Sequence, residues 1–283
     1  MDWNKSNTIL IAAFIILNIF LFVSASNNVF SEEYNAAEDE EFIQNVENLL
    51  SKKNITVNIQ LPLESYMLPT LDTEYEIIYV TEEFLKRFLG HGVTPVQDVY
   101  IYNNSKGEIL EITYGKKLHF TKREKINGKI TDESLFATKI NEFINEYAIN
   151  SEGYTENYRY MSNNNSYVEY TKHYNNYSMD NSYMRFYFDP DGIYKFEMQN
   201  ILAFKETAEK IRTFSAAEAL PRLVSYKDIK DKEIIGVEMT YYSDEDENWQ
   251  YISGINSYPV WKVIFSDGSQ KHLSSIYTYS IIE

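Results

Sequence analysis

Residues 8–25 read TILIAAFIILNIFLFVSA, a run without a charged side chain and the only long hydrophobic stretch in the chain. As a helix with about 1.5 Å of rise per residue, it would extend roughly 27 Å, close to the ~30 Å hydrocarbon core of a bilayer. The remainder of the chain is acidic, polar and rich in tyrosine. The sequence therefore predicts one transmembrane helix over 8–25, followed by a large folded part.

The residues that flank this run predict its orientation. Trp3 and Lys5 precede it, where interfacial anchors occur. No further Lys or Arg occurs before Lys52, and the residues between are rich in carboxylates. The positive-inside rule therefore predicts a single-pass protein of the cell membrane, with a cytoplasmic stub over 1–7 and an extracellular C-terminal domain. Residues 26–35 are small and polar, which indicates a tether.

A cleaved signal peptide is the alternative. Val23-Ser24-Ala25 resembles a small-residue cleavage site, which would release a chain that begins after Ala25. Asp2 cancels the charge of Lys5, whereas signal peptides begin with a positively charged region. We therefore expect the span to be retained, and a comparison of the membrane-bound mass with the calculated mass distinguishes the two.

One face of the predicted span carries a polar residue, Asn18. A side-chain amide in lipid needs a hydrogen-bond partner, and such a bond between two helices contributes about 0.6–2 kcal/mol. The residues that share this face at helical spacing are Ile11, Phe14, Ile15, Leu21 and Phe22. We expect this face to pack against another membrane helix; the alternative is an amide that bonds to its own backbone.

The N-terminal residues resemble one known family. Met1-Asp2-Trp3-Asn4-Lys5, Ile9-Leu10-Ile11 and Phe14-Ile15-Ile16-Leu17-Asn18-Ile19-Phe20-Leu21 resemble the start of YycI (WalI) proteins. These are single-span accessory proteins of the WalK–WalR (YycG–YycF) two-component system in low-GC Gram-positive bacteria. The resemblance implies two partners, the sister protein YycH and the WalK sensor kinase, and a regulatory role that chiefly restrains the kinase. The close match covers about the first 21 residues.

The composition limits the possible partners. The net charge is −16, so phosphate would be repelled and nucleic-acid binding is not expected. The same charge argues against anionic wall polymers and acidic lipid surfaces, and favours a cationic partner surface. The chain has no Cys, so its exterior part must be stabilised by its core alone, which fits a Gram-positive exterior.

Hydrophobic periodicity predicts an α+β fold after the tether. We expect two exterior units, 36–127 and 128–283, each a curved antiparallel sheet with helices packed on one face. Helices are predicted over 36–51, 82–89 and 131–149, with a short one opened by a capping box at Ser215–Glu218. Strands are predicted over 54–61, 75–80, 99–102, 109–114, 118–121, 155–161, 167–174, 184–188, 193–199, 234–242, 260–265 and 273–279.

No motif for catalysis, a metal or a cofactor stands out. The four histidines have no ligand spacing, so we interpret them as isolated surface or strand residues. Asp189-Pro190-Asp191-Gly192 predicts a turn rather than a calcium loop, since the later ligands of such a loop are missing. The acidic run 244–247 indicates a solvated loop. The sequence therefore predicts a protein that is not an enzyme and has neither cofactor nor metal.

Tyrosines are concentrated in one part of the chain. Ten of the 25 lie between Tyr154 and Tyr194. Tyrosine is common at protein interfaces, but it also suits half-buried strands. We therefore keep two interpretations, sheet packing and an exterior contact. The candidate contact residues are Tyr158, Tyr160, Tyr167 and Tyr170.

Together these features predict a membrane-anchored extracellular regulator. A stub over 1–7 is too short for a signalling domain, so any signal would pass through helix or exterior contacts. Combined with the family resemblance, this predicts modulation of WalK together with YycH. The alternative is an extracellular binding module for a peptide or a cell-wall fragment.

Substitution of Asn18 by Leu tests the predicted helix contact. The change removes the only polar side chain in the middle of the span, so recovery of a membrane partner by co-purification should fall. Equal recovery of the partner with the original chain and with the Asn18→Leu variant, at equal expression, would contradict the contact.

Overall fold

The computed structural model describes residues 36–96, 100–128, 130, 133–162, 166–245 and 249–276. The predicted span over 8–25, its partner face, the anchors Trp3 and Lys5, the stub and the tether all lie outside these residues. Within the described residues, no helix has both the length and the apolar character that a bilayer crossing requires. The chain divides into two compact units, Met1–Asn48 and Leu49–Glu283.

The described residues form a mixed α+β fold, as the periodicity predicts. The α-helices are α2 (Ala36–Ser51), α3 (Glu82–Leu89), α4 (Phe136–Glu146) and α5 (Ala216–Ala219). The strands of the N-terminal half are β1 (Thr56–Val57), β2 (Met67–Tyr75), β3 (Thr94–Val96), β4 (Ile101–Asn103), β5 (Ile109–Thr113) and β6 (Lys117–Thr121). The later strands are β7 (Thr155–Tyr160), β8 (Ser166–Tyr174), β9 (Tyr177–Asp189), β10 (Gly192–Gln199), β11 (Ile201–Arg212), β12 (Glu233–Tyr242), β13 (Gly254–Phe265) and β14 (Gln270–Ser274).

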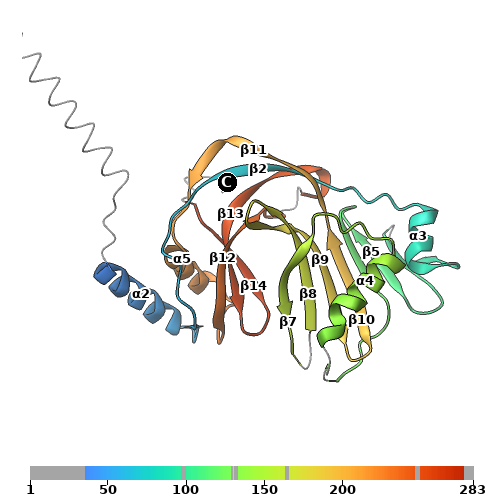
Figure 1. Ribbon diagram of the computed structural model, residues 1–283, viewed down its shortest axis with the longest axis horizontal. Coiled ribbons are helices and arrows are strands. Elements are labelled where there is room, and N and C mark those ends of the chain that lie inside the picture. The colour runs from blue at the N-terminus through green and yellow to red at the C-terminus, as the bar shows by residue number, and fades with distance from the viewer. Residues whose placement is uncertain are drawn as a thin grey trace, which may run out of the picture. The chain divides into compact units, whose positions relative to one another are not determined.

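The strands form one curved sheet that does not close. Its main path runs β11-β2-β13-β12-β9-β10-β6-β5-β4-β3. Off this path, β14 pairs with β13, β8 pairs with β9, and β7 pairs with β8. Figure 1 shows the sheet bending between the β11–β2–β13–β12 part and the β9–β10 part. Pairing is antiparallel except between β12 and its partners β1 and β9. The parallel contact between β12 and β9 covers only two residue pairs, so it is the narrow link between the two parts.

Strand pairing joins chain segments from both sides of residue 128. β6 pairs with β10, and β2 lies between β11 and β13. The intervals 36–127 and 128–283 that we expect as domains therefore share one sheet, and the division itself stays a prediction. The order of elements along the chain suggests a domain boundary near residue 128. Hydrogen bonding between strands that are distant in sequence determines which segments lie side by side in the sheet.

The larger core lies under α3 and α4, on one face of β5, β6, β8, β9 and β10. Phe143 on α4 is buried against the rings of Phe120, Phe186 and Phe196, with centroid distances of 6.3, 5.8 and 5.2 Å. Phe88 on α3 stacks on Tyr147 at 5.4 Å. Alternate residues of these strands fill this core, so the intervening residues point to the opposite face. Helices on one face are thus confirmed for this part of the sheet (Figure 1).

A smaller core lies where β2 meets the β12–β13 side. Tyr75 packs edge-on against Trp249 at 5.5 Å, and Tyr241 donates a hydrogen bond to the carbonyl of Pro69 at 2.9 Å. Outside this core, Trp261 on β13 is also buried and donates to the carbonyl of Phe214 at 2.9 Å. Each large ring thus buries its apolar body, and the polar groups of Tyr241 and Trp261 bond to backbone.

Local signals place several elements where the sequence predicts them. Thr81 caps α3 by accepting a hydrogen bond from the backbone N–H of Phe84 at 3.1 Å, and Gly90 ends the helix with φ of 68°. Such a positive φ suits glycine. The capping box of Ser215 and Glu218 opens α5, which continues as a 3-10 helix over Leu220–Ser225.

Strands with long-range partners are less well predicted. The expected strand over 54–61 is reduced to β1, and the expected strand over 75–80 lies after β2, which itself is not predicted. β11 is also missed, because its residues are largely exposed on both faces and show no alternation. Within the predicted helix over 131–149, the described residues form a 3-10 turn over Glu133–Leu135 followed by α4, which ends at Glu146.

Truncation of Phe143 to Ala tests the larger core. Removing a fully packed phenyl ring should lower the free energy of unfolding by about 3–5 kcal/mol, as measured by urea unfolding. Lys139 to Ala on the exposed side of α4 is the control, and we expect a change within about 0.5 kcal/mol. A loss of less than about 1 kcal/mol for the Phe143 variant would show that α4 does not cover this core.

Candidate functional site

A bulge in β9 places three polar residues at the bend of the sheet. Thr171 of β8 pairs with Tyr183, whereas the next residue, Lys172, pairs with Met179. Residues 180–182 of β9 therefore have no partner on β8. Bulges of this kind turn side chains away from the regular strand pattern and occur next to functional sites. We refer to Asp180–Ser182 as the β9 bulge.

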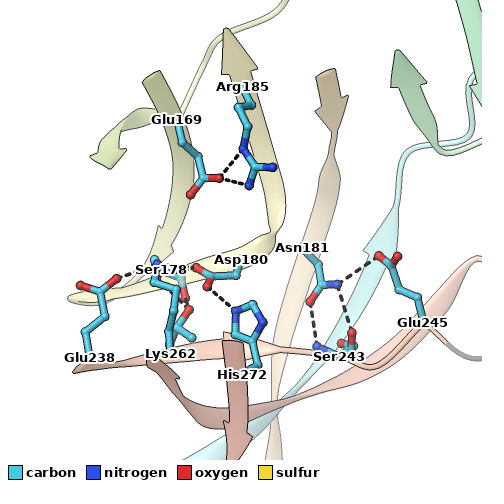
Figure 2. A network of polar contacts seen from close by, with 11 residues as sticks. Glu169, Ser178, Asp180, Asn181, Arg185, Glu238, Ser243, Glu245, Lys262 and His272 are labelled. Carbon is cyan, nitrogen blue, oxygen red and sulfur yellow. Dashed lines mark hydrogen bonds and ion pairs between the residues drawn. The ribbon is translucent and has the colours of Figure 1, made fainter. Parts of the chain in front are cut away.

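Asp180 connects β9 to β13 and β14 (Figure 2). Its Oδ1 accepts hydrogen bonds from Ser178 Oγ at 2.8 Å and Lys262 Nζ at 3.2 Å, and its Oδ2 lies 2.7 Å from His272 Nε2. Lys262 on β13 also contacts Glu238 Oε1 on β12 at 2.6 Å. The Lys262 side chain has no exposed surface and that of Asp180 is 6% exposed. A buried lysine is thus held between two carboxylates from different strands.

This arrangement shifts the pKa values of both buried groups. Burial raises the pKa of the Asp180 carboxyl, but the charge of Lys262 and the hydrogen bond with His272 outweigh it, so the pKa lies well below its ordinary value. Burial lowers the pKa of Lys262, but Asp180 and Glu238 outweigh it and raise that pKa. Both groups are therefore ionised over the ordinary pH range.

Asn181 connects the β9 bulge to the segment that follows β12 (Figure 2). Its side chain accepts from the Ser243 N–H at 2.7 Å and donates to the Ser243 carbonyl and to Glu245 Oε1, both at 3.1 Å. Glu245 also accepts from Gln199 at 2.7 Å and forms an ion pair with Lys117 on β6. One carboxylate thus bonds to residues from three strands. The interpretation of 244–247 as a solvated loop is therefore wrong for Glu245, whose side chain is 14% exposed.

These residues line a polar cleft of about 170 Å³ at the bend of the sheet. Its walls are Lys117, Glu169, Asp180, Asn181, Tyr183, Arg185, Tyr242, Glu245, Gln270 and His272. Tyr242 and His272 stack face to face, with ring centroids 3.9 Å apart. Burial, followed by nearby carboxylates, raises the pKa of Tyr242 to about 12, so its hydroxyl keeps its proton. We refer to this feature as the polar cleft.

Most charges in the polar cleft are already paired. Arg185 forms an ion pair with Glu169. Burial lowers the pKa of Arg185, but the charge of Glu169 outweighs burial and raises this pKa well above its ordinary value. The buried Nε2 of Gln270 has no hydrogen-bond partner among the described residues. The polar cleft therefore offers one buried donor and tyrosine hydroxyls, in surroundings with little unpaired charge, which suits recognition of a neutral polar group.

Acid–base catalysis is not what this geometry favours. A general acid or base works best with a pKa near the operating pH. The pKa of Asp180 is instead lowered further from neutral pH. The pKa of Glu197, on the same face of the sheet, is also lowered. Burial alone would raise this pKa, but hydrogen bonds with His119, Lys195 and Tyr187 outweigh the effect of burial. Among the described residues, no three His, Asp or Glu side chains group together as metal ligands would.

The structure separates the four tyrosines proposed for an exterior contact. The rings of Tyr158 and Tyr160 lie 5.9 and 5.8 Å from that of Tyr167, which is 6% exposed and donates to the Gly268 carbonyl at 2.8 Å. Tyr170 lies on the other face of β8, against Phe186 of the larger core. The four do not form one surface, and a contact through any of them stays a prediction.

Gly268 explains how closely the two parts of the sheet meet. It lies in the turn between β13 and β14 with φ of 80°, and a Cβ atom there would come within 2.5 Å of the Tyr160 ring. Only glycine fits both the backbone angle and the ring. The tyrosines therefore pack the β7–β8 strands against the β13–β14 turn.

Other residues singled out in the sequence have structural roles. The turn at Asp189–Gly192 is confirmed: Asp189 accepts from Arg123, from the Ile126 N–H at 2.8 Å and from the Asp191 N–H at 2.9 Å. Two histidines are not isolated, because His272 contacts Asp180 and His119 lies 3.4 Å from Glu197. Asp180 and Lys262 were not predicted as site residues from the sequence. The one available signal is a lysine within the apolar run of residues 260–265.

Comparisons with known proteins identify the family. The family model described as YycI protein matches residues 34–278, and the chain belongs to this family. The search of curated proteins gave no match. The family resemblance of the N-terminal residues is thereby confirmed over a different and much longer part of the chain.

Three solved structures are similar to this chain to different degrees. The crystal structure of YycH from Bacillus subtilis is 12% identical, with a TM-score of 0.51, over 75% of this chain and 53% of that chain. This chain thus spans about half the length of that YycH. An uncharacterized protein from Eubacterium rectale is 12% identical, with a TM-score of 0.41, over 84% of this chain and 99% of that chain. The Bacillus megaterium YpeB C-terminal domain is 8% identical, with a TM-score of 0.32, over 69% and 99%.

Replacement of Asp180 by Asn tests the ion network. Because the folded pKa of Asp180 is depressed, its stabilisation is fully present above the unfolded pKa of about 4 and is lost as the pH falls through the folded pKa. The variant should lose about 3–5 kcal/mol of unfolding free energy at pH 7, towards the lower end because Glu238 still faces Lys262. It should also show a shallower loss of stability below about pH 5.

Urea unfolding at a series of pH values measures both quantities. Asp72 to Asn, at an exposed position of β2, is the control and should change stability by less than about 0.5 kcal/mol. If the Asp180 variant matched the control in stability and in pH slope, the network would not stabilise the fold.

Proposed function

We propose that this member of the YycI family is a membrane-anchored accessory regulator of a WalK-type sensor histidine kinase, and that it acts with a YycH-like sister protein. The observation that carries the proposal is the family match over residues 34–278. The YycH structure from Bacillus subtilis supports a shared fold and no more, because the identity is 12%.

The proposed topology follows from the charges around the apolar run. In this proposal 8–25 spans the membrane, 1–7 lies in the cytoplasm, and the sheet lies outside the cell. The absence of cysteine means that the exterior part is stabilised by its two cores and by ion networks such as that of Asp180. Such a fold does not depend on oxidation, which suits an exterior without disulfide chemistry.

Regulation would occur by a shift between conformations of the kinase. A bound protein changes such an equilibrium only by the difference in its affinity for the two states. The face of the span with Asn18 supplies one contact, and the exterior fold supplies a second whose position a rigid sheet can fix. We propose restraint of the kinase as the direction, as the family implies.

The polar cleft favours a second candidate function, an exterior binding module for a peptide or a cell-wall fragment. Its buried Gln270 donor has no partner among the described residues, and its tyrosine hydroxyls remain protonated. Uncharged hydroxyl or amide groups are the ligands that such a surface suits. A ligand there could act alone or could adjust the regulatory assembly.

Exchange of residues 8–25 for an unrelated membrane helix of equal length tests the regulatory proposal. The exchanged chain should remain in the membrane, and recovery of the kinase and the YycH-like protein with the tagged chain should fall. Kinase output, measured by phosphorylation of its response regulator, should rise towards that of cells without this protein.

The Gln270 to Ala variant is the matched control, because it changes the polar cleft and leaves 8–25 intact. It should retain the partners and the kinase output. If the exchanged chain regulated the kinase normally, or if neither partner were recovered with the original chain, the proposed function would be wrong. Loss of regulation in the Gln270 variant alone would favour the binding module.

A further inference from the structure

A cluster of lysines forms a positively charged hollow on this strongly acidic chain. Lys52, Lys53, Lys227 and Lys230 line a space of about 510 Å³ together with Asn54 and Asp231. The net charge of the lining side chains is therefore +3, whereas that of the chain is −16. Asp228 belongs to the same turn but does not line the space. We refer to this feature as the lysine hollow.

The floor of the lysine hollow is fixed by bonds between two distant turns. The carbonyl of Lys53 accepts from the Asp231 N–H at 3.0 Å, and Asn54 donates to Asp231 Oδ1 at 2.8 Å. Lys53 Nζ donates to the carbonyl of Tyr226 at 2.8 Å. These contacts join positions more than 170 residues apart in the chain. The backbone that carries the lysines is thus held in place before any ligand binds.

Three of the four ammonium groups are available. Lys52, Lys227 and Lys230 are exposed, and none of the described carboxylates forms an ion pair with them. Elsewhere on the chain lysines are commonly paired, as Lys117 is with Glu245 and Lys232 with Asp267. Unpaired like charges that face one hollow repel each other, and an anion between them removes that repulsion.

The positive charge of the lysine hollow allows an anion to bind there, although the net charge of the whole chain predicts repulsion of anions. A net charge of −16 repels polyanions at long range, but salt screens such fields beyond about 8–10 Å. Within the lysine hollow the nearest charges are the ammonium groups, and lysine is a common ligand of phosphate as a point charge. The only lining carboxylate, Asp231, is occupied by Asn54.

We propose that the lysine hollow binds a phosphate group of an anionic ligand, either the headgroup of an acidic phospholipid or a phosphate of a soluble polyanion. The three free ammonium groups would surround the phosphate oxygens, and the fixed floor of Lys53, Asn54 and Asp231 would hold the lysine backbones in place. This role is additional to the regulation proposed above and does not depend on it.

Titration calorimetry on the full chain in a neutral detergent tests the proposal. The probes are inorganic pyrophosphate, a short-chain phosphatidylglycerol, and a short-chain phosphatidylcholine of zero net charge. Pyrophosphate, phosphatidylglycerol or both should bind, and phosphatidylcholine should bind at least tenfold more weakly. Binding of pyrophosphate identifies the phosphate group alone as sufficient, whereas binding of phosphatidylglycerol alone identifies the lipid headgroup.

Two triple variants with the same change in total charge provide the decisive comparison. Lys52, Lys227 and Lys230 to Gln should weaken binding about a hundredfold, or about fivefold for each lysine. Lys106, Lys205 and Lys210 to Gln removes three exposed lysines elsewhere and should change binding less than about threefold. All six positions are exposed, so both variants should fold, which circular dichroism checks.

Three results would overturn the proposal. The first is an absence of binding by both anionic probes. The second is an equal loss of affinity in the two triple variants, which would show attraction by overall charge alone. The third is equal binding of phosphatidylcholine and phosphatidylglycerol, which would show that the net negative charge of the ligand is not recognised.

Discussion

The contact between Lys262 and Asp180 is the constraint on which the bend of the sheet depends. Both groups are removed from water, and the cost of desolvating two charges is recovered only with good geometry and further hydrogen bonds. Here Glu238, Ser178 and His272 supply them. Because these partners come from β9, β12, β13 and β14, the strands cannot shift relative to one another without leaving a buried charge unpaired.

The bulge in β9 positions Asp180 for this ion network. A regular strand would direct the successive residues Asp180 and Asn181 to opposite faces of the sheet, whereas both line the polar cleft. The unpaired segment 180–182 lets β9 leave β12 and continue between β8 and β10. The polar cleft then follows as the space between the two parts of the sheet. Its side chains are polar because they carry the contacts that hold the bend.

Elements defined by neighbouring residues could be predicted from the sequence, and those defined by distant ones could not. Thr81 and Gly90 lie at the two ends of α3, so a short stretch contains the whole signal. The partner of β11 is β2, more than 100 residues earlier, and nothing in the residues of β11 indicates it. The same holds for the candidate site: Asp180 and Lys262 are 82 positions apart, and only the fold brings them together. The family, in contrast, was indicated by a short N-terminal motif.

The pairing of β2 with strands far later in the sequence affects how the protein folds during synthesis. β2 is complete at Tyr75, but its neighbours β11 and β13 end only at Arg212 and Phe265. The ribosome must therefore synthesise the chain as far as Phe265 before both neighbours of β2 are available for pairing. Contacts between residues so far apart in the sequence also form slowly. Until then β2 presents unpaired edges that invite association with other nascent chains. Chaperone capacity during synthesis should therefore raise the expression yield of this chain.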